Sequence, residues 1–233
     1  NQSAREPVDY VNPYMGNISH LLVPTFPTIH LPHSILRVYP ERRDFTGDVL
    51  EGLPIVVTSH RGSSAFNLSP FYESRKELKP VVAYSYDNEK ITPYSYSVYL
   101  DEEGISAEYG LSHQSAIYEL LFEKEEAVRV ALNSRRGDLT WDGTAFSGFQ
   151  MIENDTKVYL YLLPDQLPEC IAVGRGKSGE QNLCYRQECM SCHELPRGQQ
   201  KAYTSLWNFF YRCRTGTREY EAGIEWEKSD FSP

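Results

Sequence analysis

Prolines restrict the backbone between residues 10 and 64 more than any other feature of this sequence does. The stretch contains six of them, at Pro13, Pro24, Pro27, Pro32, Pro40 and Pro54. Proline fixes φ, lacks an amide hydrogen and disfavours helical backbone at the residue before it. Regular helix is therefore largely excluded here. We predict extended segments and loops that the rest of the fold holds in place.

Polar side chains are also concentrated in this stretch, which holds four of the six histidines. Binding residues are often carried by irregular backbone of this kind. The polar groups offered are those of His20, His30, His33, Arg37, Arg42, Arg43, His60 and Arg61. The simpler interpretation is that the segment wraps a β-sheet, with its prolines at strand edges and its histidines hydrogen-bonded.

From Leu53 onward the sequence shows the pattern of short β-strands. In residues 94–100 the even-numbered side chains share one face of a strand, so one face must be core. Asp142–Gly143 is a strong hairpin signal, because both residues tolerate positive φ. We therefore predict an all-β chain that forms a large antiparallel two-sheet β-sandwich. The expected strands are 54–59, 80–87, 94–100, 105–109, 115–123, 127–132, 139–141, 146–151 and 157–163, with turns at 87–89, 137–138 and 142–143.

The composition excludes several classes of protein. The formal net charge of -9 argues against nucleic-acid binding, because clustered lysine and arginine hold a phosphate backbone. No run of about 18 apolar residues predicts a membrane span. Phosphate-binding glycine loops, G-x-S-x-G elbows and H-E-x-x-H helices are missing from the sequence. Tyrosine is abundant at 17 residues, and its ring can fill a core or stack on a sugar.

Two short motifs near the start carry a family resemblance. Asn12–Gly16 reads N-P-Y-M-G, and Thr25–Pro27 reads T-F-P before an apolar, proline-containing run that ends at Pro40. This opening resembles the N-terminal domain of glycoside hydrolase family 92, the calcium-dependent, inverting exo-α-mannosidases of gut Bacteroidetes and related bacteria. The likeness extends over about Asp9 to Gln166. Thr28 replaces the glycine that usually follows T-F-P in the family, and Pro32–Ser34 stands for its P-F-G.

The resemblance implies a galactose mutarotase-like sandwich and a limited role in catalysis. In the family, the two catalytic carboxyl groups and most calcium ligands belong to a C-terminal helical domain. We therefore predict no catalytic residue and no cofactor within this chain, although calcium is implied for the full-length family. The sandwich forms one wall of the sugar pocket. By position, we expect that His20, His30, His60 and Arg61 face this pocket, with Arg37 and Asp44 behind them. The carboxylates of Glu41, Asp44, Asp48 and Glu51 are interpreted as solvated charges.

Residues 167–233 differ from residues 1–166 and contain all five cysteines. Cys189–His193 matches a haem attachment or zinc-ligand pattern, but it is solitary, and a disulfide is the better interpretation in an oxidising compartment. Plausible codons for residues 207–223, read one nucleotide later, encode a string that resembles the family's link into its helical domain. We therefore predict a sandwich domain over 1–166 and a divergent tail over 167–233 that derives from a frameshift.

Two functions of different class follow. The first is the N-terminal sandwich of an α-mannosidase-like glycoside hydrolase, inactive alone, whose partners are an α-mannoside glycan and the helical catalytic domain. The second is a stand-alone secreted carbohydrate-binding module. The chain begins at Asn1 without methionine, which we interpret as a mature protein whose leader was removed. The expected location is secreted or periplasmic, with outer-membrane association left open.

Overall fold

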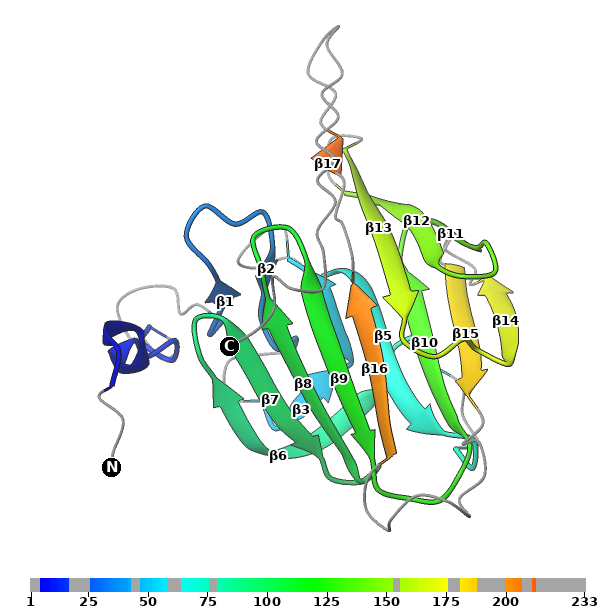
Figure 1. Ribbon diagram of the computed structural model, residues 1–233, viewed down its shortest axis with the longest axis horizontal. Helices are drawn as coiled ribbons and strands as arrows, with labels where there is room; N and C mark the ends of the chain where they lie inside the picture. Colours follow the sequence, from blue (N-terminus) through cyan, green and yellow to red (C-terminus); the bar gives the residue numbers. More distant parts are fainter. Residues whose placement is uncertain are drawn as a thin grey trace, which may run out of the picture.

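The computed structural model describes residues 5–16, 26–42, 47–57, 64–75, 79–152, 156–175, 181–187, 200–206 and 211–212. One short 3₁₀ turn, η1 (Pro7–Tyr10), precedes the strands (Figure 1). The strands are β1 (Ile29–His30), β2 (Arg37–Val38), β3 (Val49–Glu51), β4 (Leu53–Val56), β5 (Ala65–Tyr72), β6 (Ala83–Ile91), β7 (Ser95–Leu100), β8 (Ile105–Leu111), β9 (Ala116–Phe122), β10 (Val128–Ser134), β11 (Gly137–Trp141), β12 (Phe146–Met151), β13 (Lys157–Pro164), β14 (Cys170–Arg175), β15 (Gln181–Gln187), β16 (Gln200–Leu206) and β17 (Tyr211–Arg212).

The strands form two large antiparallel sheets, which confirms the predicted all-β sandwich. The smaller sheet has the order β14-β15-β10-β5-β4. The larger has ten strands in the order β11-β12-β13-β16-β9-β8-β7-β6-β3, with β17 beside β13. β1 and β2 form a separate two-stranded sheet. No helix in the described part of the chain has the length and apolar character needed to span a bilayer.

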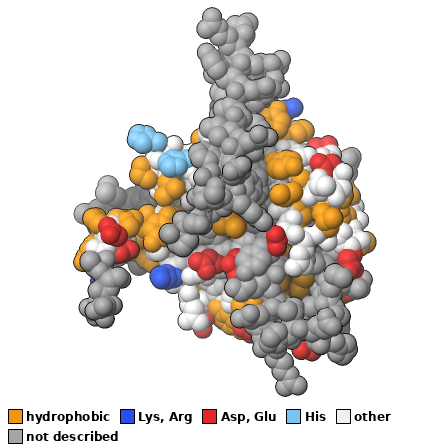
Figure 2. Space-filling model, in the orientation of Figure 1, with side chains coloured by type: hydrophobic (Ala, Val, Ile, Leu, Met, Phe, Trp, Pro, Cys, Tyr) orange, Lys and Arg blue, Asp and Glu red, His pale blue; other side chains and the backbone are white. Residues whose placement is uncertain are grey.

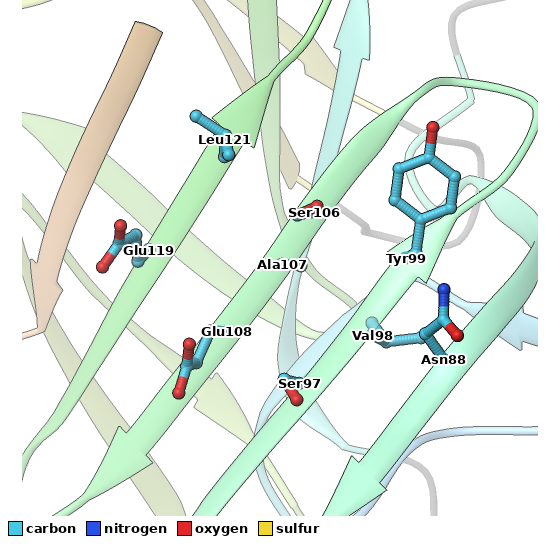
Figure 3. Close-up of a pocket in the computed structure, with 9 residues that line it drawn as sticks. All are labelled: Asn88, Ser97, Val98, Tyr99, Ser106, Ala107, Glu108, Glu119 and Leu121. Atoms are coloured by element: carbon cyan, nitrogen blue, oxygen red, sulfur yellow. The ribbon is translucent and has the colours of Figure 1, made fainter. Parts of the chain in front are cut away.

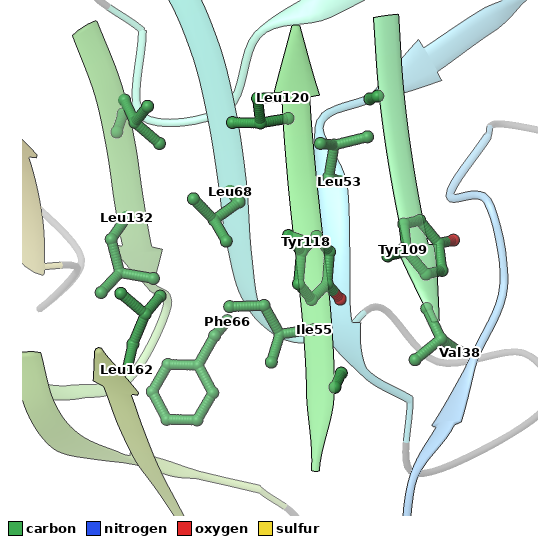
Figure 4. Packing of buried hydrophobic residues seen from close by; sticks show 14 of the residues in the cluster. Val38, Leu53, Ile55, Phe66, Leu68, Tyr109, Tyr118, Leu120, Leu132 and Leu162 are labelled. Atoms are coloured by element: carbon green, nitrogen blue, oxygen red, sulfur yellow. The ribbon is translucent and has the colours of Figure 1, made fainter. Parts of the chain in front are cut away.

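Alternating burial explains why the central strands of the larger sheet form where they do. In β7, Tyr96, Val98 and Leu100 are buried, and Ser95, Ser97 and Tyr99, which alternate with them, are less so. The same alternation holds in β8 and β9. The buried faces meet side chains of the smaller sheet, such as Leu53 and Leu68, in one continuous core (Figure 4). The alternation predicted for 94–100 is therefore confirmed from residue 96 onward, whereas Tyr94 is exposed in a turn.

Strand β5 was not predicted, because its sequence does not alternate. All eight of its residues are buried, including two polar ones. Asn67 Nδ2 donates to the carbonyl oxygen of Glu51 at 2.8 Å, and Ser69 Oγ donates to Asn67 Oδ1 at 3.2 Å. Pro70 is tolerated because the pairing with β4 on that side ends at Leu68, so no ladder partner there needs an amide hydrogen.

The predicted turns had mixed outcomes. The turn expected at Asp87–Glu89 is wrong, because β6 continues through these residues with a register shift, and Asn88 adopts φ 53° there. β11 begins at Gly137, so no turn separates the strands at residues 137–138. The Asp142–Gly143 hairpin is confirmed. Asp142 Oδ1 accepts hydrogen bonds of 2.8 Å from the amides of Thr144 and Ala145.

Residues beyond 166 contribute strands to both sheets. β14 and β15 extend the smaller sheet beyond β10, and β16 lies between β13 and β9 in the larger one. The Cys189–His193 motif and most of residues 207–223 lie outside the described residues. Cys170 is an exposed free thiol. The predicted domain boundary after residue 166 and the frameshift stay predictions.

Candidate functional site

Three loops meet at one end of the larger sheet. The β1–β2 loop is joined to the β8–β9 turn where the amide of Ile35 donates to the carbonyl oxygen of His113 at 2.9 Å. Ser34 Oγ donates to the same oxygen at 3.0 Å. The amide of His30 donates to the carbonyl oxygen of Pro93, in the β6–β7 turn, at 3.0 Å. These contacts fix the proline-rich segment against the end of the sheet.

His30 and Arg37 are the two predicted site residues that the structure describes. They are directly opposite each other in the β1–β2 pair. His30 is exposed, and its Nε2 lies 3.1 Å from the carbonyl oxygen of Ser34, so a neutral ring donates there and keeps Nδ1 as an acceptor. Arg37 is half-buried, and its carbonyl oxygen accepts from the amide of Val57 at 2.8 Å.

The other four predicted site residues, His20, Asp44, His60 and Arg61, lie outside the described residues. Their proposed contacts with a sugar stay predictions.

The predicted site residues did not include four further neighbours. His33, which the sequence offers as a polar group, and Ile35 lie in the β1–β2 loop, whereas Tyr94 and His113 come from two other loops. His33 and His113 are exposed, Tyr94 is 42% exposed and Ile35 is 45% exposed. Figure 2 shows histidine side chains next to hydrophobic ones on this side of the molecule. We call the set His30, His33, Ile35, Arg37, Tyr94 and His113 the loop-end surface. Imidazole groups exchange hydrogen bonds with hydroxyl groups, and an exposed tyrosine ring can stack on a sugar.

Glu41 supports the segment behind the loop-end surface. The interpretation of Glu41 as a solvated charge is wrong, because it is only 6% exposed. Its Oε1 accepts from Arg135 Nη2 at 2.9 Å, and its Oε2 accepts from Ser64 Oγ at 2.7 Å. Burial, assisted by the charge of Glu41, raises the pKa of nearby Tyr39 to about 12. Glu41 is therefore a structural anchor.

Glu89 plays a similar part for the N-terminal segment. It forms an ion pair with Arg42 and accepts from the hydroxyl of Tyr96 at 3.0 Å. Its other oxygen accepts from the hydroxyl of Tyr14 at 3.2 Å. Arg42 Nη1 also donates to the hydroxyl of Tyr86 at 2.7 Å. Glu41 and Glu89 are both engaged in such contacts, so we assign neither a catalytic proton transfer.

The described residues include no group of three or more histidine, cysteine, aspartate or glutamate side chains that could hold a metal ion. The family resemblance implies calcium for the full-length family. No chemical step is derived through it.

A shallow cavity of about 300 Å³ lies on the outer face of the larger sheet. The small side chains of Ser97 and Ser106 leave space for this cavity. Glu108 and Glu119 lie directly opposite each other on β8 and β9 beside it (Figure 3). Tyr99 closes another side, where its hydroxyl donates to Glu123 at 2.9 Å. The lining can exchange hydrogen bonds with a ligand that carries hydroxyl groups.

The fold is similar to that of solved mannosidases of one family. The family GH92 inverting mannosidase BT2199 from Bacteroides thetaiotaomicron VPI-5482 gives a TM-score of 0.70 at 17% identity, covering 89% of this chain and 32% of that one. The family GH92 α-mannosidase BT3965 from Bacteroides thetaiotaomicron gives 0.66 at 14% identity, covering 85% and 33%. The BT3965 complex with mannoimidazole gives the same score, identity and coverage of this chain, with 32% of that chain covered.

The chain thus spans about a third of the length of these solved relatives. No curated protein matches its sequence. Residues 10–165 match the Glycosyl hydrolase family 92 N-terminal domain, which is more than half of the chain. On that match the chain belongs to glycosyl hydrolase family 92, through its N-terminal domain.

Proposed function

We propose that this chain is the β-sandwich part of an α-mannosidase-like glycoside hydrolase, and that it contributes one wall of a glycan pocket. The observation that carries the proposal is the family match over residues 10–165. The loop-end surface supports it, because His30 and Arg37 are paired there beside the exposed ring of Tyr94. These groups can orient a sugar, but they do not supply an acid and a base.

Cleavage with inversion requires two carboxyl groups on opposite sides of the scissile bond, about 6.5 to 9.5 Å apart. The best-buried carboxylates near the loop-end surface, Glu41 and Glu89, are engaged with Arg135 and Arg42. The solved relatives are about three times as long as the part that this chain matches. We infer that the catalytic carboxyl groups belong to that further length, as does the calcium site.

The domain boundary, the origin of the tail and the location of the protein complete the proposal. A sandwich over 1–166 followed by out-of-frame sequence predicts a second reading frame in the DNA that continues into a helical domain. Resequencing the locus tests this directly. A glycan substrate agrees with a secreted or periplasmic location, which fractionation of the producing cells would test.

The test of function is an assay of the purified chain with a panel of α-mannosides in the presence of calcium. We expect no turnover. Turnover that survives repurification would show that the catalytic carboxyl groups lie within these residues, and it would refute the proposal. Binding should be followed in the same samples by calorimetry, with the variants His30→Ala and Ser106→Phe.

The alternative is a stand-alone carbohydrate-binding module, which the cavity beside Ser106 favours. This alternative would be supported if the chain binds a glycan without turnover, and if Ser106→Phe abolishes that binding while His30→Ala preserves it. Loss of binding in His30→Ala alone would instead locate the sugar at the loop-end surface.

A further inference from the structure

Strand β14 is an open edge of the smaller sheet. It pairs with β15, and no strand in the described part of the chain pairs with the N–H and C=O groups on its other side. Its sequence, C-I-A-V-G-R, has no proline and carries a charge only at its last position. Val173 is 60% exposed. An apolar and proline-free edge of this kind readily accepts a further strand.

The other end strands of the two large sheets are protected. β4 contains Pro54, and all four of its residues are buried. The amide of Val57, directly after the strand, donates to the carbonyl oxygen of Arg37. β11 carries the exposed charge of Asp138. β3 is only three residues long and follows Asp48. These are the devices by which proteins prevent edge-to-edge pairing, and β14 has none of them before Arg175.

We propose that two copies of this chain associate through β14, paired antiparallel around a two-fold axis at Ala172, so that their smaller sheets become one continuous sheet. The inference concerns assembly and does not depend on the role of the chain in glycan recognition.

Backbone geometry restricts the possible registers. In an antiparallel pair, opposite residues both direct their N–H and C=O groups at the partner strand, or both direct them away. This direction alternates along a strand, so two copies of one strand can pair only with the two-fold axis beside a residue, never midway between two residues. The axis at Ala172 satisfies this condition and pairs residues 170–174 with the same residues of the second copy.

Chemical complementarity selects Ala172 among the permitted axes. This register places Ile171 opposite Val173 of the second copy, and Glu169, just before the strand, opposite Arg175. Each pair occurs twice by symmetry, and both apolar and opposite-charge pairs across strands are favourable. An axis at Ile171 or at Val173 separates Glu169 from Arg175. Charge complementarity thus favours a second copy as the occupant of the edge.

Sedimentation of the full chain over a range of concentrations tests the proposal, with a monomer–dimer equilibrium as the expected result. Glu169 is exposed, so Glu169→Arg should leave the fold intact. It should weaken the dimer about tenfold, because two attractive pairs become repulsive. Adding Arg175→Glu should restore the dissociation constant to within about threefold, because the charges are then exchanged.

Val173→Lys should also weaken the dimer, whereas Val49→Lys should not. Val49 is its matched control, because it is 41% exposed on the edge strand β3 of the other sheet. A chain that stays monomeric at all concentrations would overturn the proposal. So would a dimer that the two charge changes and Val173→Lys leave unaffected.

A thiol cross-link checks the register. Position 174 lies opposite Cys170 of the second copy when the axis is at Ala172. A side chain added at Gly174 meets nothing within 4 Å in the single chain, so Gly174→Cys should not disturb the fold. With diamide as the oxidant, we expect a disulfide between Cys170 of one copy and position 174 of the other, identified by peptide mass spectrometry. Cross-linked dimers that lack this peptide would refute the register.

Discussion

Replacing Tyr118 with phenylalanine is expected to destabilise the sandwich, whereas the same change at Tyr109 is not. The two residues are opposite each other on β9 and β8, with ring centroids 5.0 Å apart, and both rings are at most 1% exposed. They differ in one interaction. The hydroxyl of Tyr118 donates to the carbonyl oxygen of Pro54 at 2.6 Å and so joins the two sheets. The hydroxyl of Tyr109 has no hydrogen-bond partner among the described residues.

The magnitude follows from this difference. Tyr118→Phe leaves the carbonyl oxygen of Pro54 buried without a donor, which costs about 1 to 3 kcal/mol. For a chain of this length, 2 kcal/mol corresponds to a fall in Tm of about 6 °C. Tyr109→Phe removes a hydroxyl that is buried without compensation, so stability should be unchanged or should rise by up to about 1 kcal/mol.

Urea unfolding of both variants, followed by far-UV circular dichroism, measures these free energies. The slope of the free energy of unfolding against urea should stay the same, because neither change alters the surface that unfolding exposes. Equal losses in the two variants would mean that ring packing, and not the hydrogen bond between the sheets, determines the cost. That result would refute the reasoning.

Three further changes test the framework around the sites. Gly52→Ala should destabilise the fold by about 2 kcal/mol or more in thermal unfolding, since Gly52 has φ +64° and an added Cβ would lie 2.0 Å from Asn67 Oδ1. Unchanged stability would contradict this backbone geometry. Glu41→Ala should lower the free energy of unfolding in urea by about 2 kcal/mol, less than for a fully buried pair because the Arg135 side chain is 30% exposed. Glu41→Gln should recover part of this loss. Full stability of Glu41→Ala would show that Glu41 is not a structural anchor. Burial raises the pKa of Tyr39 to about 12 from the ordinary value of 10.0, so the stability that neutral Tyr39 contributes is complete below pH 10 and is lost as pH rises toward 12. The free energy of unfolding, measured on both sides of pH 10, should therefore fall with rising pH above 10. An equal fall in Tyr39→Phe would exclude Tyr39 as its source.

Most of the strands that the sequence predicts have a single buried face, although the apolar runs of β4 and β10, which are almost wholly buried, were also predicted. β7, β9 and β13 alternate because one side meets the core and the other does not. β5 is buried on both sides, so its polar residues look like loop residues until their partners in other strands are known. Local sequence contains no information about those partners. The same limit applies to Asn88, whose turn-like character serves a bulge inside β6.

The candidate site was predictable only where it is continuous in sequence. His30 and Arg37 were identified from the proline-rich segment, and they are paired in the structure. Tyr94 and His113 reach the same surface from two other loops, through backbone hydrogen bonds that no spacing rule describes. Glu41 was misinterpreted because its arginine partner lies 94 positions away. Charge alone does not distinguish a solvated carboxylate from a buried one.

The position of β16 has a consequence for how the chain is made. This strand lies between β9 and β13, both of which leave the ribosome earlier, and it pairs Leu206 with Ala116. Until residues 200–206 emerge, the larger sheet consists of two separate halves, each with an open edge. Pairing between segments so distant in sequence is slow, and unpaired edges recruit wrong partners in the meantime. Chaperone demand during synthesis should therefore peak before residue 200 and fall once β16 has joined the halves.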